Sequence, residues 1–116
     1  MARPGAKNLV MYAGDGFAMR LRFWRQEEDG TRNARDISAS IWLAQIRRHE
    51  SADEVLATFA IDLTDAADGY LTLGLSGSIV SDVYPRGVWD LQETAPGAEP
   101  NTKLAGRVIV KKDVSR

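Results

Sequence analysis

Cysteine is absent from the 116 residues of this chain, and histidine occurs once. The missing cysteines exclude a disulfide framework, a thiolate zinc site and a thiol nucleophile. No apolar run is long enough to cross a membrane, and the first residues lack the apolar stretch of a signal peptide. Fifteen Lys and Arg against sixteen Asp and Glu give a net charge of −1. A general electrostatic attraction to nucleic acid or to an anionic membrane is therefore not expected.

What the chain does contain is a series of short segments with alternating apolar residues, separated by turn residues. This pattern is typical of β-sandwiches and β-barrels. The expected strands cover residues 9–12, 17–24, 37–48, 55–61, 70–75, 88–94 and 102–111. A helix over 51–60 is the main alternative to the fourth strand, because Ser51 and Glu54 imitate a capping box. Segment 76–85 is less regular, and residues 82–87 are expected to form a corner between sheets.

Short strands without a strong helix predict an all-β fold. We expect an immunoglobulin-like antiparallel β-sandwich of about seven strands, formed by a single domain over residues 1–116. Residues 1–8 are expected to form a flexible N-terminal arm. An OB-like barrel is the alternative, but it would need about five longer strands and usually a helix. The residues expected to share one core are Phe17, Leu21, Phe23, Trp42, Ile46, Phe59, Leu71, Leu73, Trp89, Leu91, Val108 and Val110.

The single histidine is the first candidate for catalysis. His49 lies near Ser51 and Asp53 in the sequence, which could suggest an acyl-transfer site. Such a site requires a nucleophile, a base and an orienting acid that converge beside an oxyanion hole. Nothing in the sequence supplies that arrangement, so a solvent-exposed turn histidine is the favoured interpretation. The glycine-rich segments 14–16 and 74–78 lack the Gly-Lys-Ser/Thr ending of a phosphate loop, and no catalytic residue is predicted.

Three aspartates at regular spacing are the only candidate for a metal site. Asp62, Asp65 and Asp68 recur at every third position before Gly69. Calcium takes about six to eight oxygen ligands, and the EF-hand loop supplies them mainly from alternate positions with a distal glutamate. The observed spacing differs, so we predict an aspartate-rich turn in which these side chains accept backbone hydrogen bonds. No metal or cofactor is expected.

Two strand faces are candidate docking surfaces. Arg20, Arg22 and Trp24 share the polar face of their strand, and Trp and Arg are enriched at the energetic centres of protein interfaces. Alternatively, Trp24 closes the rim of the fold and its arginine neighbours stack on it. Ile41 and Leu43 form the second candidate surface, because their strand is apolar on both sides and only one side can face the core.

An ordered set of short segments carries a resemblance to a known family. The set comprises Gly14-Asp15-Gly16-Phe17, Asp29-Gly30, Arg35-Asp36-Ile37-Ser38, Ala44-Gln45-Ile46-Arg47, Gly87-Val88-Trp89-Asp90-Leu91-Gln92 and Ala105-Gly106-Arg107-Val108-Ile109-Val110. Through these segments, over about residues 14–116, the chain resembles a small β-sandwich domain of tailed-bacteriophage structural proteins. That domain occurs in minor tail proteins and at the amino terminus of upper-baseplate proteins. The chain departs from the family pattern where Ser38 and Ala39 replace the usual Thr-Gly turn.

The resemblance implies a non-enzymatic virion protein that docks onto other phage structural proteins of the tail, baseplate, connector or capsid. It implies several copies in a symmetric particle assembled in the cytoplasm of a bacterial host. No nucleic-acid or membrane partner is expected. The alternatives are a capsid decoration protein and a cellular carbohydrate- or peptide-binding module. A sugar-binding module would need an aromatic platform, for which Trp24 and Tyr84 are the candidates.

Overall fold

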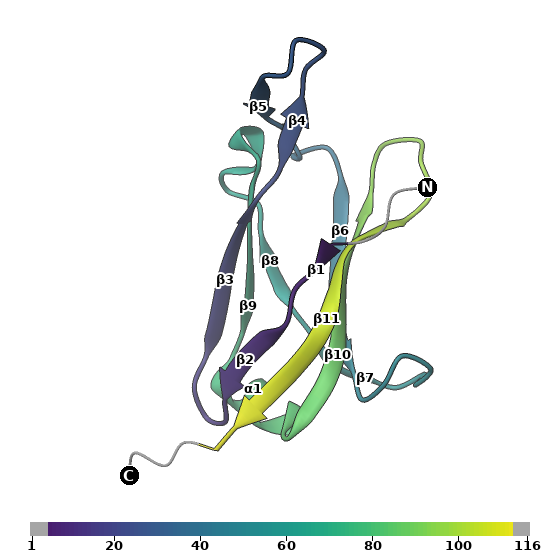
Figure 1. The fold of residues 1–116 in the computed structure, drawn as a ribbon. Helices are drawn as coiled ribbons and strands as arrows, with labels where there is room; N and C mark the ends of the chain where they lie inside the picture. Colours follow the sequence, from purple (N-terminus) through teal and green to yellow (C-terminus); the bar gives the residue numbers. More distant parts are fainter. Residues whose placement is uncertain (1–4, 113–116) are drawn as a thin grey trace.

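The computed structural model describes residues 5–112, in which two β-sheets pack face to face (Figure 1). The larger sheet contains β1 (Gly5–Ala6), β2 (Leu9–Tyr12), β11 (Asn101–Lys111), β10 (Arg86–Thr94), β6 (Ile41–Arg47) and β7 (Val55–Thr58). The smaller sheet contains β3 (Phe17–Arg22), β9 (Tyr70–Leu75) and β8 (Ala60–Asp62). A separate hairpin of β4 (Trp24–Gln26) and β5 (Arg32–Ala34) projects beyond the sheets. The expected all-β fold is confirmed.

The core lies between the two sheets and is built from the apolar phase of each strand. The expected core residues that are buried are Trp42, Ile46, Phe59, Leu71, Leu73, Trp89, Leu91, Val108 and Val110. Phe17, Leu21 and Phe23 are only half-buried and pack against its margin. Buried residues outside the expected set include Met11 and Ile37. The alternation of apolar and polar residues therefore predicted correctly which side chains of these strands face the core. It did not predict every segment that contributes side chains to the core.

Several expected strand boundaries are wrong. The strand expected at 37–48 begins at residue 41, because Asp36 Oδ1 accepts hydrogen bonds from the N–H and hydroxyl of Ser38 in a turn. The strand expected at 17–24 ends at Arg22, and Trp24 begins the hairpin. The strand expected at 55–61 is divided at Phe59, where the chain passes from β7 in the larger sheet to β8 in the smaller sheet. A strand can thus keep its alternation while it changes sheets.

The segment 76–85, expected to be irregular, contains the helix α1 (Gly77–Val83), and the corner expected at 82–87 is formed by the end of this helix and the start of β10. The Ser76 hydroxyl caps it by accepting a hydrogen bond from the N–H of Ile79 at 3.4 Å. Val80 and Val83 lie one turn apart on the same side of the helix, and both are fully buried. The helix therefore closes one end of the core (Figure 1).

The larger sheet is mixed rather than purely antiparallel as expected, because β1 and β2 both run parallel to β11. The carbonyl of Lys7, between β1 and β2, accepts a hydrogen bond from Trp89 Nε1 at 2.8 Å. Gly106 on β11 lies so close to this carbonyl that a Cβ atom would collide with it. Residues 5–8 of the expected flexible arm are thus bound to β11, while residues 1–4 lie outside the described residues.

Candidate interaction surfaces

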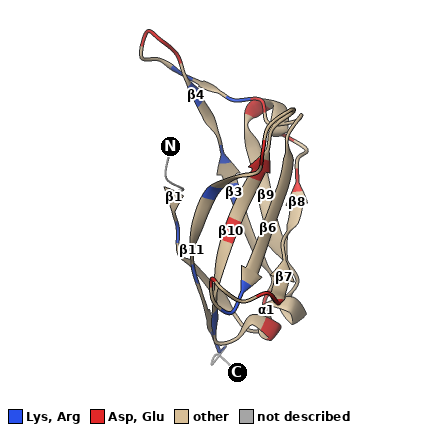
Figure 2. Ribbon diagram, turned by 90° about the vertical axis from the view of Figure 1, so that its right-hand side faces the viewer, with Lys and Arg blue, Asp and Glu red and all other residues tan. Residues whose placement is uncertain are grey.

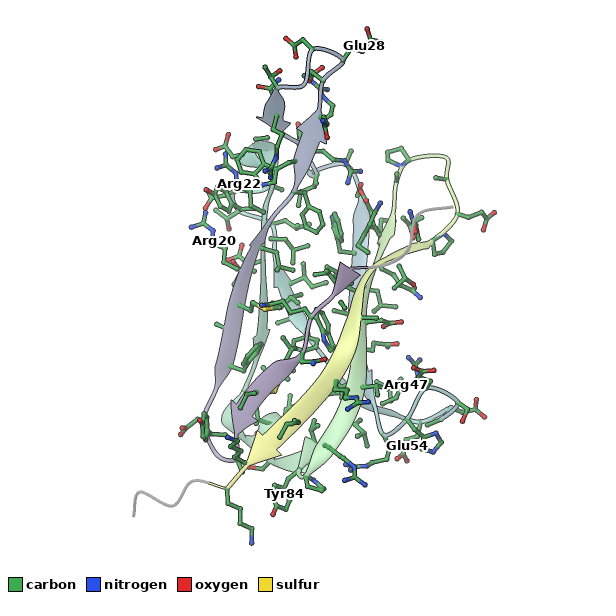
Figure 3. The ribbon with its side chains drawn as sticks, in the orientation of Figure 1. Arg20, Arg22, Glu28, Arg47, Glu54 and Tyr84 are labelled. Atoms are coloured by element: carbon green, nitrogen blue, oxygen red, sulfur yellow. The ribbon has the colours of Figure 1, made fainter. Side chains whose placement is uncertain are left out.

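The first candidate surface covers the outward face of the smaller sheet. Arg20 and Arg22 point away from the core because β3 alternates between half-buried and exposed side chains (Figure 3). The strand register pairs Arg22 with Tyr70 of β9. The guanidinium carbons of Arg20 and Arg22 lie 3.7 and 4.6 Å from the centre of the Tyr70 ring. Both arginines therefore make cation–π contacts with the same tyrosine.

The stacking continues from the sheet into the β4–β5 hairpin. The guanidinium carbon of Arg22 lies 4.3 Å from the Trp24 ring centre, and that of Arg32 lies 4.8 Å from it. The stacking considered above as the alternative to a docking role is present for Arg22, whereas Arg20 lies over Tyr70 instead, and Trp24 is 43% exposed. We call the resulting series the Arg–aromatic column; its members are Arg20, Tyr70, Arg22, Trp24 and Arg32. Sequence reasoning missed Tyr70 and Arg32, because only strand pairing brings them to this face.

The positive charge of the column is concentrated at its hairpin end. Arg20 forms an ion pair with Asp65 at 3.0 Å, and Arg22 donates from Nε to the carbonyl of Asp68 at 3.1 Å. Among residues 5–112, Arg22 and Arg32 have no carboxylate within ion-pair distance. Their guanidinium groups are held in place by aromatic rings and present N–H groups at their edges.

The second candidate surface is the outward face of the larger sheet. Ile41 is 71% exposed and Leu43 is 41% exposed, although β6 lies between β10 and β7 in the sheet. Their neighbours on β10 are Thr94 and Gln92, so the two aliphatic side chains have polar side chains beside them on that strand. The outward orientation expected for Ile41 and Leu43 is confirmed.

A groove of about 480 Å³ lies on the same face of the larger sheet. Side chains from β6, β10 and β11 line it, including Gln45, Arg47, Asp90 and Arg107. Burial raises the pKa of the Asp90 carboxyl, although the positive charge of Arg47 opposes the shift. Sequence reasoning did not find this groove, because its lining comes from alternate residues of strands that are distant in the sequence.

Glu93 is the one charged residue that is buried within residues 5–112. Its carboxylate accepts hydrogen bonds from both terminal nitrogens of Arg35, at 2.9 and 2.5 Å, and from the Ser40 hydroxyl at 2.5 Å. Lys103 Nζ lies 3.7 Å away. Burial raises the pKa of Glu93, but the hydrogen bonds and positive charges outweigh it and hold this pKa below the ordinary value. The cluster ties the segment that follows the hairpin to β10.

The residues considered for acyl transfer do not converge. His49 is exposed after the end of β6, and its Nδ1 atom lies 3.1 Å from the Ser51 hydroxyl. No hydrogen bond or ion pair joins Asp53 to this pair within the described residues. The local geometry is therefore that of a turn in which a histidine contacts a serine.

The three aspartates considered for a metal have other contacts. Asp62 Oδ1 accepts hydrogen bonds from the hydroxyl and N–H of Thr64, and these bonds lower the pKa of Asp62. Asp65 binds Arg20, and Asp68 lies in a short 3₁₀ turn that ends at Gly69. Over residues 5–112, no three His, Asp or Glu side chains form a group that could hold a metal ion. Over the same range, no helix has the length and apolar character needed to span a membrane.

No protein-family model matches the chain, and no curated protein matches it in sequence.

Proposed function

We propose that the protein is a non-enzymatic structural component of a tailed-bacteriophage virion that acts through protein–protein docking. Its place in the particle would be of the minor tail, baseplate or head–tail adaptor type, and it would assemble in the host cytoplasm. The ordered segments that resemble phage structural domains support this proposal, and so does the two-sheet all-β fold. The observation that carries the docking role is the exposed Arg–aromatic column.

The column has the chemistry of a preorganised docking surface. Stacking already restricts Arg22 and Arg32, so binding a partner would order few further side-chain rotamers. Trp24 adds a large apolar area beside these two cations, and Trp with Arg is a frequent combination at interface centres. Ile41 and Leu43 offer a second, purely aliphatic contact on the opposite sheet.

The sugar-binding alternative is less consistent with the aromatic residues. A sugar ring stacks on an open aromatic face, but two guanidinium groups already lie over Trp24. Tyr84 has Lys112 Nζ 5.6 Å from its ring centre and lies at the other end of the molecule from Arg22 (Figure 3). The two candidate rings therefore do not form one platform. A capsid decoration protein would use the same docking chemistry and would differ in its place on the particle.

Mass spectrometry of purified virions from the phage that encodes the chain tests the proposal. We expect the protein at a fixed stoichiometry to the other structural proteins, and its absence from virions would overturn the assignment. The double change Trp24→Ala and Arg22→Glu should leave the fold intact and reduce incorporation. Glu54→Gln, on the loop before β7, is the matched surface control and should be incorporated normally. Ile41→Lys tests the second surface in the same way.

A further inference from the structure

The β4–β5 hairpin is attached to the rest of the molecule by little more than its base. Its strands pair with each other through three residue pairs, and within the described chain they belong to no larger sheet. The base is held where Phe23 donates its N–H to the carbonyl of Gly69 and Arg35 donates its N–H to that of Phe23. Hairpins of this kind are marginally stable alone, and they gain from a further contact surface.

The two faces of the hairpin differ in how their charges are satisfied. On one face, Arg25 binds Glu27 at 2.8 Å, and Glu27 also accepts a hydrogen bond from Asn33. On the other face, Arg32 stacks on Trp24 and makes no ion pair among residues 5–112. On the first face the charges of Arg25 and Glu27 therefore neutralise each other. On the second face the guanidinium group of Arg32 remains accessible to a carboxylate of another molecule.

The tip of the hairpin carries the opposite charge. Glu28 lies at this tip, pointing away from the molecule, between two further acidic residues in the turn that ends at Gly30 (Figures 2 and 3). Asp29 is engaged, because its Oδ1 atom accepts two hydrogen bonds from Thr31. Glu28 is exposed and has neither an ion pair nor a side-chain hydrogen bond within the described residues. The hairpin thus carries one carboxylate without an ion pair at its tip, and one cation without an ion pair, Arg32, nearer its base.

Glu28 forms no ion pair with these cations inside the described chain. The strand register places Arg32 opposite Gln26, about 7 Å along the hairpin from Glu28, and its guanidinium group lies over Trp24, farther from the tip. Ion pairs require separations of about 4 Å or less. Two hairpins laid side by side in opposite directions would place each tip beside the cations of the other hairpin.

We propose that the β4–β5 hairpin is a self-association surface, on which a second copy of the chain docks antiparallel through a two-fold interface. In such an interface each contact occurs twice, so Glu28 of each copy meets Arg32 and Arg22 of the other. Trp24 of both copies is covered at the centre. This proposal rests on the docking role and names a second copy of the chain as the molecule that contacts the column, and it is tested on the purified chain.

Sedimentation velocity over a range of protein concentrations, up to about 1 mM, tests the proposal. We expect wild-type chain to dimerise weakly at low salt and less at high salt, because the pairs are exposed. Arg32→Glu alone and Glu28→Arg alone should each weaken dimerisation at least about tenfold, because each places like charges opposite one another twice. The matched controls Arg107→Glu and Glu54→Arg carry the same charge changes outside the hairpin and should dimerise like wild type.

Mixing the two variants gives the decisive measurement. In an equimolar mixture of Arg32→Glu and Glu28→Arg, both contacts between positions 28 and 32 of a mixed dimer again join opposite charges, although the arginine introduced in one copy also faces Arg22 of the other. The mixture should therefore dimerise more strongly than either variant alone. Both changes lie on exposed side chains, and an unchanged thermal midpoint verifies that each variant is folded. A monomeric wild type, or a mixture no better associated than its components, overturns the proposal. Either result leaves virion incorporation as a separate measurement.

Discussion

The sandwich and the β4–β5 hairpin are held together by different interactions. In the sandwich, apolar side chains from both sheets fill one core, and Phe59 lies 6.3 Å from Phe17 and 5.9 Å from Trp89, measured between ring centres. In the hairpin, no side chain is fully buried, and the contacts are ion pairs, hydrogen bonds and stacked cations. The stability of the molecule should therefore depend on the sandwich, whereas its interactions can be changed in the hairpin without unfolding it.

The largest expected effect comes from deleting a large side chain in the sandwich. Trp89→Ala removes a buried indole and its hydrogen bond to Lys7, so we expect a loss of about 3–5 kcal/mol in the free energy of unfolding. Trp24→Ala is the matched change in the hairpin and should cost less than about 2 kcal/mol, because Trp24 is 43% exposed and lies outside the core. Urea unfolding followed by circular dichroism measures both values. Equal losses would show that the two regions do not differ in this way.

A smaller loss is expected at the junction of the two regions. Glu93→Gln keeps the size of the side chain but removes its negative charge. That charge pairs with Arg35 and strengthens the hydrogen bond that the carboxylate accepts from the Ser40 hydroxyl. We expect a loss of about 2–3 kcal/mol in the free energy of unfolding at neutral pH. A protease should also cut the variant faster between β5 and β6, where Arg35 and Ser40 bind Glu93. Cutting at the wild-type rate would show that Glu93 does not hold this segment against β10.

The same carboxylate should make stability depend on pH. The pKa of Glu93 is lower in the folded protein than the ordinary value of 4.5, so its contribution is complete above that value. It is lost as the pH falls through the lower, folded pKa. The stability difference between wild type and Glu93→Gln should therefore shrink below about pH 4.5. A difference that is constant from neutral to acidic pH would show that this charge does not stabilise the fold.

The smallest expected effect has the opposite sign. Burial raises the pKa of Asp90 in the groove of the larger sheet, so its charged form is less favourable in the folded protein. Asp90→Asn should stabilise the protein at neutral pH by less than about 1 kcal/mol, since the side chain is partly solvated. The gain should disappear at low pH, where wild-type Asp90 is protonated. A destabilised variant would instead indicate that the Asp90 charge makes a useful contact.

Alternation predicted which side chains face inward, but it could not predict which strands pair. Trp89, Leu91 and Glu93 share one phase of β10, and all three are buried. The partner of Glu93 could not be inferred in this way, because Arg35 lies 58 positions earlier and follows the hairpin. Likewise, the alternation through Phe59 gives no sign that the chain changes sheets there. Such features depend on long-range packing, which leaves no periodic signal in a single sequence.

The candidate surfaces, like the fold, could be predicted from the sequence only in part. Residue type and strand phase identified the outward positions of Arg22, Trp24 and Ile41. They could not predict that Tyr70 lies beneath two arginines, because this contact requires the register between β3 and β9. The short helix α1 was missed because it includes a glycine and spans only two turns, so its apolar spacing resembles that of a loop.

The parallel pairing of β2 with β11 has a mechanical consequence. Both strands run the same way, and Leu9 pairs with Val108 while Lys111 pairs with Tyr12, so the start of β2 and the end of β11 lie at opposite ends of the paired segment. A force that pulls the start of β2 away from the end of β11 acts along these strands and loads all the hydrogen bonds between them at once. They cannot be broken one after another, as they would be if the strands were peeled apart from one end. The domain should therefore resist stretching along its length and transmit tension as a stiff link.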